Sequence, residues 1–437
     1  MEENVDNKVK FTEREVDLNG YLGLEARYTD NHRLHGNSLV LRQSSDEARI
    51  TEGFTKEENF VVQRSRLLYI ENSLIVGQIG GEHRWDFLGN LETNWLWTRA
   101  NAGRKAPNER SFRFDQIPNG GGDFFLSRRA GNNEINFSDL NDDDESFRFD
   151  VKLPLEFHQN FQLALQSGFI NRTKSRDSEI RRFTFSPRGP DARRQDVLGL
   201  GSLEKILVPE FIGPNGFQLR ESTQATDNST ATQDLFSYYG QGDLNLFEKV
   251  RITGGLRVED NDQQVKTFEL FNPDRSPAIA KLVKKDVLPS VAAIWTISDK
   301  QQLRASYAKT VSRPDFREFS SAPFIDPETD RITIGNPDLQ QVDITHYDVR
   351  WEYYFSPNES MSIGGFWKTL KNPIELILLP GAAGVLTLQN AQTADVYGIE
   401  VELMKHLDFI HPRLRHVFVS TNYTLSLIHI SEPTRPY

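Results

Sequence analysis

A strict alternation of apolar and polar residues is the feature that most limits what this chain can fold into. In residues 347–355 (YDVRWEYYF) every odd position is apolar or aromatic, whereas the even positions carry an acid, a base, an acid and a tyrosine. On a β-strand these two sets face opposite sides, while a helix would mix them around its circumference. The same pattern recurs in residues 147–153, 252–258 and 397–403. The pattern therefore predicts an all-β protein.

The alternating runs come in pairs joined by short turns, and they predict about fourteen strands in seven hairpins. Brief connections rich in turn formers or charges lie at 29–32, 247–249, 298–300 and 356–359. The predicted pairs are 15–28 with 33–44, 60–84 with 90–102, 146–157 with 160–175, 234–246 with 250–268, 287–297 with 301–312, 343–355 with 359–370, and 393–404 with 414–426.

The connections between hairpins are far longer than the turns within them. They cover residues 103–145, 176–233, 269–286, 313–342 and 371–392. Short turns at one end and long loops at the other are typical of an outer-membrane barrel, with short periplasmic turns and long extracellular loops. We therefore expect the two longest connections to lie together, at the end opposite the short turns.

The charges on the polar face favour a membrane barrel over a soluble one. A soluble barrel buries its inward face, where charges such as Arg350 and Glu352 would be costly. In a wide barrel that holds water or a plug, the polar face points inward and stays wet. We therefore predict that Val349, Trp351 and Tyr353 face lipid while Arg350 and Glu352 face the lumen.

The alternative is a soluble all-β protein, for instance a carbohydrate-active one, with charged faces around a dry core. A glycosidase needs a pair of carboxylates in a cleft, and the chain has 62 acidic residues. The sequence therefore leaves this reading open. Outward aromatic side chains distinguish the two, because girdles at two heights favour a membrane protein.

The composition excludes several other classes. The 437-residue chain has no cysteine, which excludes a disulfide scaffold, cysteine-ligated zinc and a thiol nucleophile. No run approaches the roughly 18 consecutive apolar residues of a transmembrane helix. The net charge of -11 argues against nucleic acid as the main partner. Residues 1–20 contain no signal peptide, and we interpret them as an internal start.

Several short blocks follow one another in a specific order and spacing. They are Leu288-Pro289-Ser290, residues 303–316 (LRASYAKTVSRPDF), residues 335–339 (GNPDL), residues 371–375 (KNPIE), and NAQ with YGIE within residues 390–400. In these blocks the chain resembles TonB-dependent outer-membrane receptors, strongly from residue 287 onward and more weakly over residues 15–426. We interpret Pro289 as the start of a strand, Pro314 as the end of one, and residues 336–338 as a turn.

The resemblance implies a function without covalent chemistry. Receptors of this family have about 22 strands around a lumen plugged by an N-terminal domain. They bind a small-molecule ligand at the extracellular loops and the plug. The TonB complex pulls on a short N-terminal segment, the TonB box, and uses the proton gradient. The resemblance also implies the outer membrane of a Gram-negative bacterium, with lipid and lipopolysaccharide as neighbours. The ligand class (siderophore, haem, cobalamin or oligosaccharide) stays open.

The chain departs from this family pattern in three ways: it has fewer predicted strands, no predicted plug, and an atypical final segment. Residues 1–426 predict a partial, antiparallel up-and-down transmembrane β-barrel with about 14 of about 22 strands and no plug. Such a sheet leaves two open edges. Residues 427–437 (LIHISEPTRPY) resemble a translated sequencing adapter, and we expect this tail to be non-native and unpaired or loosely held. The TonB contact then belongs to a missing N-terminal region.

No catalytic, cofactor-binding or metal-binding residue is predicted, and no cofactor. The acidic run at 141–145 is interpreted as a solvated loop tip, because it lacks the spaced ligands of a calcium loop. The glycines at 120–122 are interpreted as loop flexibility. His32 and His35 have the wrong spacing for a shared metal site. A cluster of arginines is predicted in one external loop, where it would steer an anionic ligand, contact lipopolysaccharide or simply be solvated; its members are Arg172, Arg176, Arg181, Arg182 and Arg188.

Overall fold

The computed structural model is a single curved antiparallel sheet in which fourteen strands follow one another in chain order. It describes residues 5–55, 60–116, 123–128, 133–158, 160–224, 226–268, 277–325, 332–379 and 385–431. The strands are β1 (Val5–Thr29), β2 (His32–Thr55), β3 (Phe60–Trp85), β4 (Leu91–Gln116), β6 (Glu134–His158), β7 (Phe161–Pro187), β9 (Asn228–Leu246), β10 (Val250–Phe268), β11 (Ala278–Ser298), β12 (Gln301–Ser312), β15 (Val342–Ser356), β16 (Glu359–Lys371), β19 (Thr393–His406) and β20 (Phe418–Ser431).

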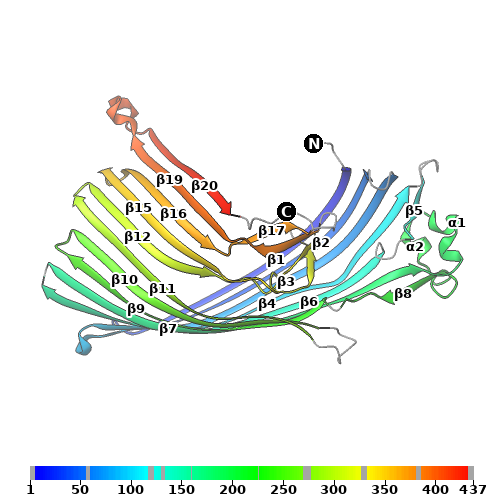
Figure 1. Cartoon of the computed structure of the whole chain (residues 1–437), viewed down its shortest axis with the longest axis horizontal. Coiled ribbons are helices and arrows are strands. Elements are labelled where there is room, and N and C mark those ends of the chain that lie inside the picture. Colours follow the sequence, from blue (N-terminus) through cyan, green and yellow to red (C-terminus); the bar gives the residue numbers. More distant parts are fainter. Residues whose placement is uncertain are drawn as a thin grey trace.

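The sheet forms an open trough whose edges are β1 and β20 (Figure 1). The predicted hairpins are all present, so the predicted fold class and hairpin pairing are confirmed. The short turns lie at one end of the trough, and the connections after β4 and after β7 lie at the other end, as predicted. Within the described residues, no helix is long and apolar enough to cross a membrane.

Several strands are much longer than predicted, always toward the end with the long connections. Strands β4 and β7 have 26 and 27 residues, whereas about 9–11 residues cross a bilayer. The prediction that 103–145 and 176–233 are entirely loops is therefore wrong, because their ends belong to β4, β6 and β7. Beyond the bilayer both faces of a strand contact water. The hydrogen bonds between strands continue there, but the alternation of apolar and polar residues, from which the strands were predicted, is lost.

The expectation that residues 427–437 are unpaired is wrong for the first part of that segment. Residues 427–431 continue β20 and pair with residues 393–397 of β19. The segment LIHI has the β-branched composition of a strand, and its prolines come only at 433 and 436. Residues 432–437 lie outside the described residues.

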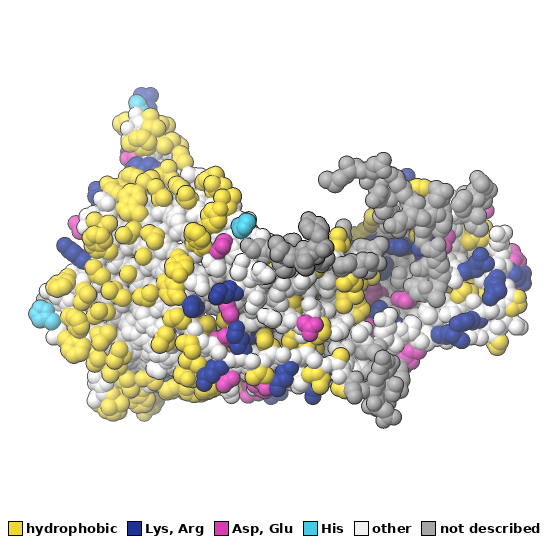
Figure 2. All heavy atoms as spheres, viewed as in Figure 1, with side chains coloured by type: hydrophobic (Ala, Val, Ile, Leu, Met, Phe, Trp, Pro, Cys, Tyr) yellow, Lys and Arg dark blue, Asp and Glu magenta, His cyan; other side chains and the backbone are white. Residues whose placement is uncertain are grey.

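The two faces of the sheet differ as the alternation predicts. Val349 is 54% exposed and lies on the convex face with Trp351 and Tyr353, whereas Glu352 is 8% exposed on the concave face. There Arg350 lies 2.5 Å from Glu402 of β19. Figure 2 shows apolar side chains gathered over the convex face of the half that carries the short turns. We call the concave face the lumenal wall and this outer apolar region the apolar band.

Aromatic side chains border the apolar band at two heights. On the side of the long connections, Tyr307, Tyr347, Trp367 and Tyr397 are cross-strand neighbours on β12, β15, β16 and β19. Their ring centroids lie 5.2 Å apart in the first pair and 5.6 Å apart in the last. Near the short turns, a second group includes Trp351, Tyr353 and Phe355 on β15, Trp85 and Phe87, and Phe157 and Phe161. Two girdles are what a membrane barrel requires and a soluble one does not.

Pro289 lies inside β11 rather than at its start, which corrects its predicted position. Pairing between β11 and β12 ends at Ser290↔Ala308. Pairing of β11 with β10 nevertheless continues to Ala278, and β12 pairs with β15 to Ser312. Proline has no N–H to donate to the ladder, so the two strands separate at this residue. We call this separation the β11–β12 seam.

We predict that Val291→Lys lowers the free energy of unfolding in phospholipid vesicles by about 2–4 kcal/mol, because the charge would enter hydrocarbon. Val291 is 43% exposed on the convex face of β11. The matched control is Ser290→Lys, one residue away on the lumenal wall, which we expect to have little effect. Urea titration followed by tryptophan fluorescence measures both. An equal loss for both variants would refute the assignment of the faces.

Candidate functional site

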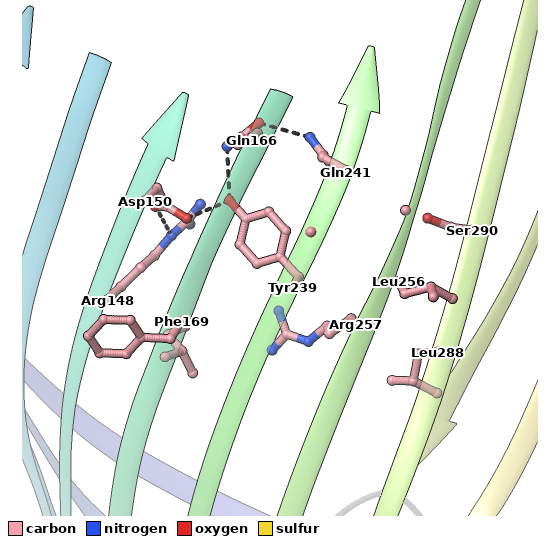
Figure 3. Close-up of a pocket in the computed structure, with 13 residues that line it drawn as sticks. Arg148, Asp150, Gln166, Phe169, Tyr239, Gln241, Leu256, Arg257, Leu288 and Ser290 are labelled. Carbon is pink, nitrogen blue, oxygen red and sulfur yellow. Dashed lines mark hydrogen bonds and ion pairs between the residues drawn. The ribbon is translucent and has the colours of Figure 1, made fainter. Parts of the chain in front are cut away.

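A hydrogen-bonded network of polar side chains occupies the lumenal wall across β6, β7 and β9. The Tyr239 hydroxyl donates to Asp150 Oδ1 at 2.6 Å and accepts from Gln166 Nε2 at 2.9 Å. Arg148 Nε donates to Asp150 Oδ2 at 2.5 Å, and Gln241 Nε2 donates to Gln166 Oε1 at 2.8 Å. Figure 3 shows these side chains converging around Tyr239.

Gly168 allows the Tyr239 ring to lie close against the wall. A Cβ atom at this position would lie 2.6 Å from Asp150 Oδ1 and 2.9 Å from Tyr239 Cε1. Together with Arg257 on β10, the network lines a pocket of about 340 Å³. Both guanidinium groups of the pocket are already paired, Arg148 with Asp150 at 2.5 Å and Arg257 with Glu259 at 2.7 Å. The pocket therefore offers hydrogen-bonding groups, and not unpaired positive charge, to a polar occupant of the lumen.

Further along the wall, a ladder of ion pairs crosses from β6 to β7. Arg176 Nη2 lies 2.5 Å from Asp142 Oδ2, and Lys174 Nζ lies 3.4 Å from the same oxygen. Arg172 pairs with Asp144. The predicted arginine cluster is therefore already neutralised at this point by the predicted acidic run.

Both of those predictions placed the residues in loops, and both are wrong. The acidic run 141–145 lies in the middle of β6, and Arg172, Arg176, Arg181 and Arg182 lie in β7. Only Arg188 follows the strand. Ion pairs between opposite charges hold β6 and β7 together beyond the bilayer. The sequence predicted loops here because these segments are polar on both faces and lack the apolar alternation of a strand.

Asp315 and Phe316, in the segment after β12, dock onto this ladder. Asp315 Oδ1 lies 3.2 Å from Arg176 Nη1. Lys174 Nζ and Arg176 Cζ each lie 5.3 Å from the centroid of the Phe316 ring, within cation–π range. Burial acts to raise the pKa of Asp315, but the backbone N–H of Arg317 and the charge of Arg176 outweigh it, so this pKa lies below its ordinary value.

Arg313, at the exit from β12, is held by two carboxylates of the lumenal wall. Its Nη2 lies 2.9 Å from Glu259 Oε2 and 3.1 Å from Asp286 Oδ2, and the three side chains are only 12%, 10% and 7% exposed. Gln341 Nε2 donates to Asp286 Oδ1 at 3.0 Å. Removing one member of a buried ion pair is costly, so this cluster determines the direction in which the chain leaves β12.

That direction is inward. The residues after β12 pack against the lumenal wall as a small apolar core, in which Phe319 is 1% exposed. Its buried members are Ala231, Val265, Ala280, Phe316, Phe319, Leu339 and Leu388. The core therefore joins two connections that are separate in sequence, one after β12 and one after β16.

The same two connections also share a second sheet of four short strands. The strands are β13 (Pro323–Ile325), β14 (Ile332–Ile334), β17 (Ile374–Leu378) and β18 (Leu386–Asn390). Within it, β14 and β18 run parallel, with Thr333 opposite Leu386. We call this sheet, with its core, the inner loop sheet.

Asparagines of the family-like blocks tie the inner loop sheet together. Asn336 Nδ2 donates to the carbonyl of Leu388 at 2.9 Å. Asn390 Oδ1 accepts from the backbone N–H of Gln340 at 2.7 Å, and Asn390 Nδ2 donates to the carbonyl of Asn372 at 2.7 Å. The predicted turn at 336–338 is present. The recognisable blocks thus supply contacts between connections, which sequence spacing alone does not reveal.

At the far end of the trough, the connections after β4 and β7 form an external lobe (Figure 1). It contains β5 (Phe124–Leu126), β8 (Phe217–Glu221), α1 (Gln195–Leu198) and α2 (Leu203–Ile206). The lobe has its own apolar core, in which Leu126, Ile206 and Phe217 are at most 1% exposed. It is therefore a packed structure and not an open loop.

His32 and His35 do not form a shared site. His32 Nδ1 lies 3.2 Å from His83 Nδ1 and its ring packs against Trp85, whereas His35 lies on the other face, beside Gly80. In the part of the chain that the structure describes, no group of three or more histidine or acidic side chains is placed to hold a metal ion. The glycines at 120–122 lie outside the described residues.

The comparisons with known proteins agree with this geometry. The family described as TonB dependent receptor-like, beta-barrel matches residues 84–432. Because this match covers most of the chain, the chain belongs to that family of outer-membrane receptors and transporters. A search of curated proteins finds no significant match.

Similar solved structures include the ferric-catecholate import receptor Fiu from E. coli K12, at 10% identity and a TM-score of 0.52 over 98% of this chain and 65% of that one. FpvA from P. aeruginosa with a bound pyoverdine has 12% identity and a TM-score of 0.50 over 96% and 55%. The ferric citrate transporter FecA has 10% identity over 96% and 60%. The chain spans less than two thirds of these proteins, and at such identities the likeness shows the fold alone.

We predict that Arg313→Ala loosens the inner loop sheet by about 3–5 kcal/mol, because Glu259 and Asp286 would stay buried without a counter-charge. Hydrogen–deuterium exchange should speed up in residues 313–325 and 332–341, with no change in β1–β4. The control is Arg194→Ala, which removes an exposed ion pair with Asp196. Unchanged exchange in the Arg313 variant would contradict the role of the cluster.

We also predict a pH dependence from Asp315. Its folded pKa is lowered, so its stabilising contribution is complete above the unfolded value of about 3.9 and is lost as the pH falls through the folded pKa. Exchange protection of residues 313–322 should therefore differ between the wild type and Asp315→Asn at pH 6, and this difference should shrink below about pH 4. A difference that does not decrease between pH 4 and pH 2.5 would show that the Asp315 charge is not its cause.

Proposed function

We propose that this chain forms the barrel wall of an outer-membrane receptor that imports a scarce nutrient with energy transmitted by TonB. The observation that supports this most is the arrangement of the two faces. The apolar band and its two girdles suit lipid, while the lumenal wall carries ion pairs and the inner loop sheet. A wall of this kind is suited to a wet lumen through which a polar solute passes.

Within this proposal, a ferric siderophore is the ligand class we favour. The solved structures with the same fold include Fiu, named as a ferric-catecholate import receptor, and FpvA with a pyoverdine. On the lumenal wall, the pocket beside Tyr239 is lined by amide side chains and by Arg148 and Arg257, each paired with a carboxylate, which suits a polar ligand that forms hydrogen bonds. Haem, cobalamin and oligosaccharides are the other classes to be tested.

The proposed partners follow from the mechanism of such receptors. TonB would engage a region other than the described strands, whereas the plug would contact the lumenal wall. Transport changes the location of the ligand and not its covalent structure, so we propose no catalytic residue. A soluble carbohydrate-active protein is not favoured, because exposed residues of the apolar band such as Val349 and Ile399 (each 54% exposed) would then face water.

We predict that a strain lacking the complete gene loses uptake of one ligand class and that the gene restores it. Radiolabelled iron supplied as catecholate, hydroxamate and citrate chelates, or as haem, is compared with labelled cobalamin and maltodextrin. Deletion of tonB and a proton uncoupler should abolish the restored uptake, because the energy comes from the inner membrane. Restored uptake that survives both treatments would indicate a passive porin and contradict the proposal.

A further inference from the structure

Two histidines meet on the convex face, at the end of the trough that carries the short turns (Figure 1). His32 is the first residue of β2 and lies directly opposite His83 of β3 in the strand register. The two rings therefore share one face of the sheet, and their Nδ1 atoms lie 3.2 Å apart. This face is the outer one, because His83 alternates with Ile79, which is 52% exposed. We call the two residues the histidine pair.

Two tryptophans and a glycine fix the orientation of the histidine pair. The ring centroid of Trp85 lies 4.9 Å from that of His32 and 5.9 Å from that of His83. Trp95 Nε1 donates to His83 Nε2 at 3.2 Å, so His83 carries its own proton on Nδ1 and donates it to Nδ1 of His32. Gly81 leaves room for these rings, because a Cβ atom there would lie 2.5 Å from Trp95 Nε1 and 2.8 Å from His83 Nε2. The two imidazoles are therefore held in place by their surroundings.

The gap between the two Nδ1 atoms has the size that a metal ion requires. A zinc–nitrogen bond is about 2.0–2.1 Å long, so two imidazole nitrogens on one tetrahedral ion lie about 3.3 Å apart. The observed separation in the histidine pair is 3.2 Å. Imidazole is a preferred ligand of zinc, copper and nickel ions. Both rings lie at the boundary of the apolar band, next to the short turns, where water can supply the remaining ligands.

The charged neighbours of the histidine pair do not oppose a cation at this place. Arg33 and Glu82 follow and precede the two histidines in the chain, but they face the lumenal wall and pair with each other at 3.1 Å. Arg84 pairs with Asp86 at 3.1 Å. Within the described residues, no lysine or arginine forms a hydrogen bond with either histidine. The electrostatic surroundings are therefore compatible with a divalent ion between the rings.

We propose that His32 and His83 bind a divalent transition-metal ion, of the zinc and copper type, through their Nδ1 atoms. The ion takes the place of the proton between the rings. That proton moves from Nδ1 to Nε2 of His83 by exchange with water, and Trp95 loses its hydrogen-bond acceptor. The ion thus joins β2 to β3 by two coordination bonds at the border of the membrane. The proposal goes beyond the transport function and does not rest on it.

The test titrates Cu²⁺ into the full-length protein, purified in detergent with an affinity tag that contains no histidine. Electron spin echo envelope modulation counts the imidazoles bound to the first equivalent of Cu²⁺, and we expect two in the wild type and one in His32→Gln or His83→Gln. Partners outside the coordination shell already change metal affinity by about 10–100-fold, so loss of a direct ligand should weaken binding at least tenfold. The matched control is His35→Gln, three residues along β2 on the lumenal wall, which should bind as the wild type does.

A further variant tests the geometry. Trp95→Phe removes the hydrogen bond that keeps the proton of His83 on Nδ1, so we expect it to strengthen Cu²⁺ binding. Zn²⁺ should displace Cu²⁺ from the wild type. A hydrogen bond between the rings without a metal role predicts equal Cu²⁺ affinity in the wild type and in both glutamine variants, and that result would overturn the proposal, as would weaker binding in Trp95→Phe. Heat-modifiable migration on gels verifies that each variant is folded. Ligand uptake enters none of these measurements, so failure here leaves the transport function untouched.

Discussion

In a bilayer, every backbone N–H and C=O group has to find its partner inside the protein, and the rest of this structure depends on that constraint. A sheet of hairpins in chain order satisfies it, because each inner strand bonds to both of its neighbours. Side chains then have only two faces to choose between. Apolar side chains occupy the face that contacts hydrocarbon, and charged side chains occupy the face toward the lumen.

The β11–β12 seam departs locally from this rule, and it does so where the barrel wall leaves the bilayer. Pro289 cannot donate to the ladder, so β12 separates from β11 after Ala308. Asp286 and Glu259 then hold Arg313 from the lumenal side. One missing N–H and one buried guanidinium therefore direct a long connection into the lumen, where it joins the connection after β16 in the inner loop sheet.

The strands and the hairpin order could be predicted from sequence, because side chains alternate between the two faces of a strand and segments such as 347–355 therefore alternate between apolar and polar residues. The strand extensions could not be predicted. In β6, residues 141–145 are polar at every position, because one face meets solvent and the other meets the arginines of β7. Charge complementarity between β6 and β7 is the feature that indicates these extensions, because Asp142 and Asp144 pair with Arg176 and Arg172. Which acid pairs with which arginine depends on the register of the hairpin, and the sequence alone does not define that register.

The sequence by itself determined the fold class, the two faces of the sheet and the family, because each follows from local alternation or from short ordered blocks. Only the tertiary structure decided which distant residues meet. Arg313 is 54 residues beyond Glu259, and Asn336 is 52 residues before Leu388, and no local pattern connects them. Ion pairs and packing contacts form between strands whose curvature and register bring them together, so only the assembled sheet reveals the inner loop sheet.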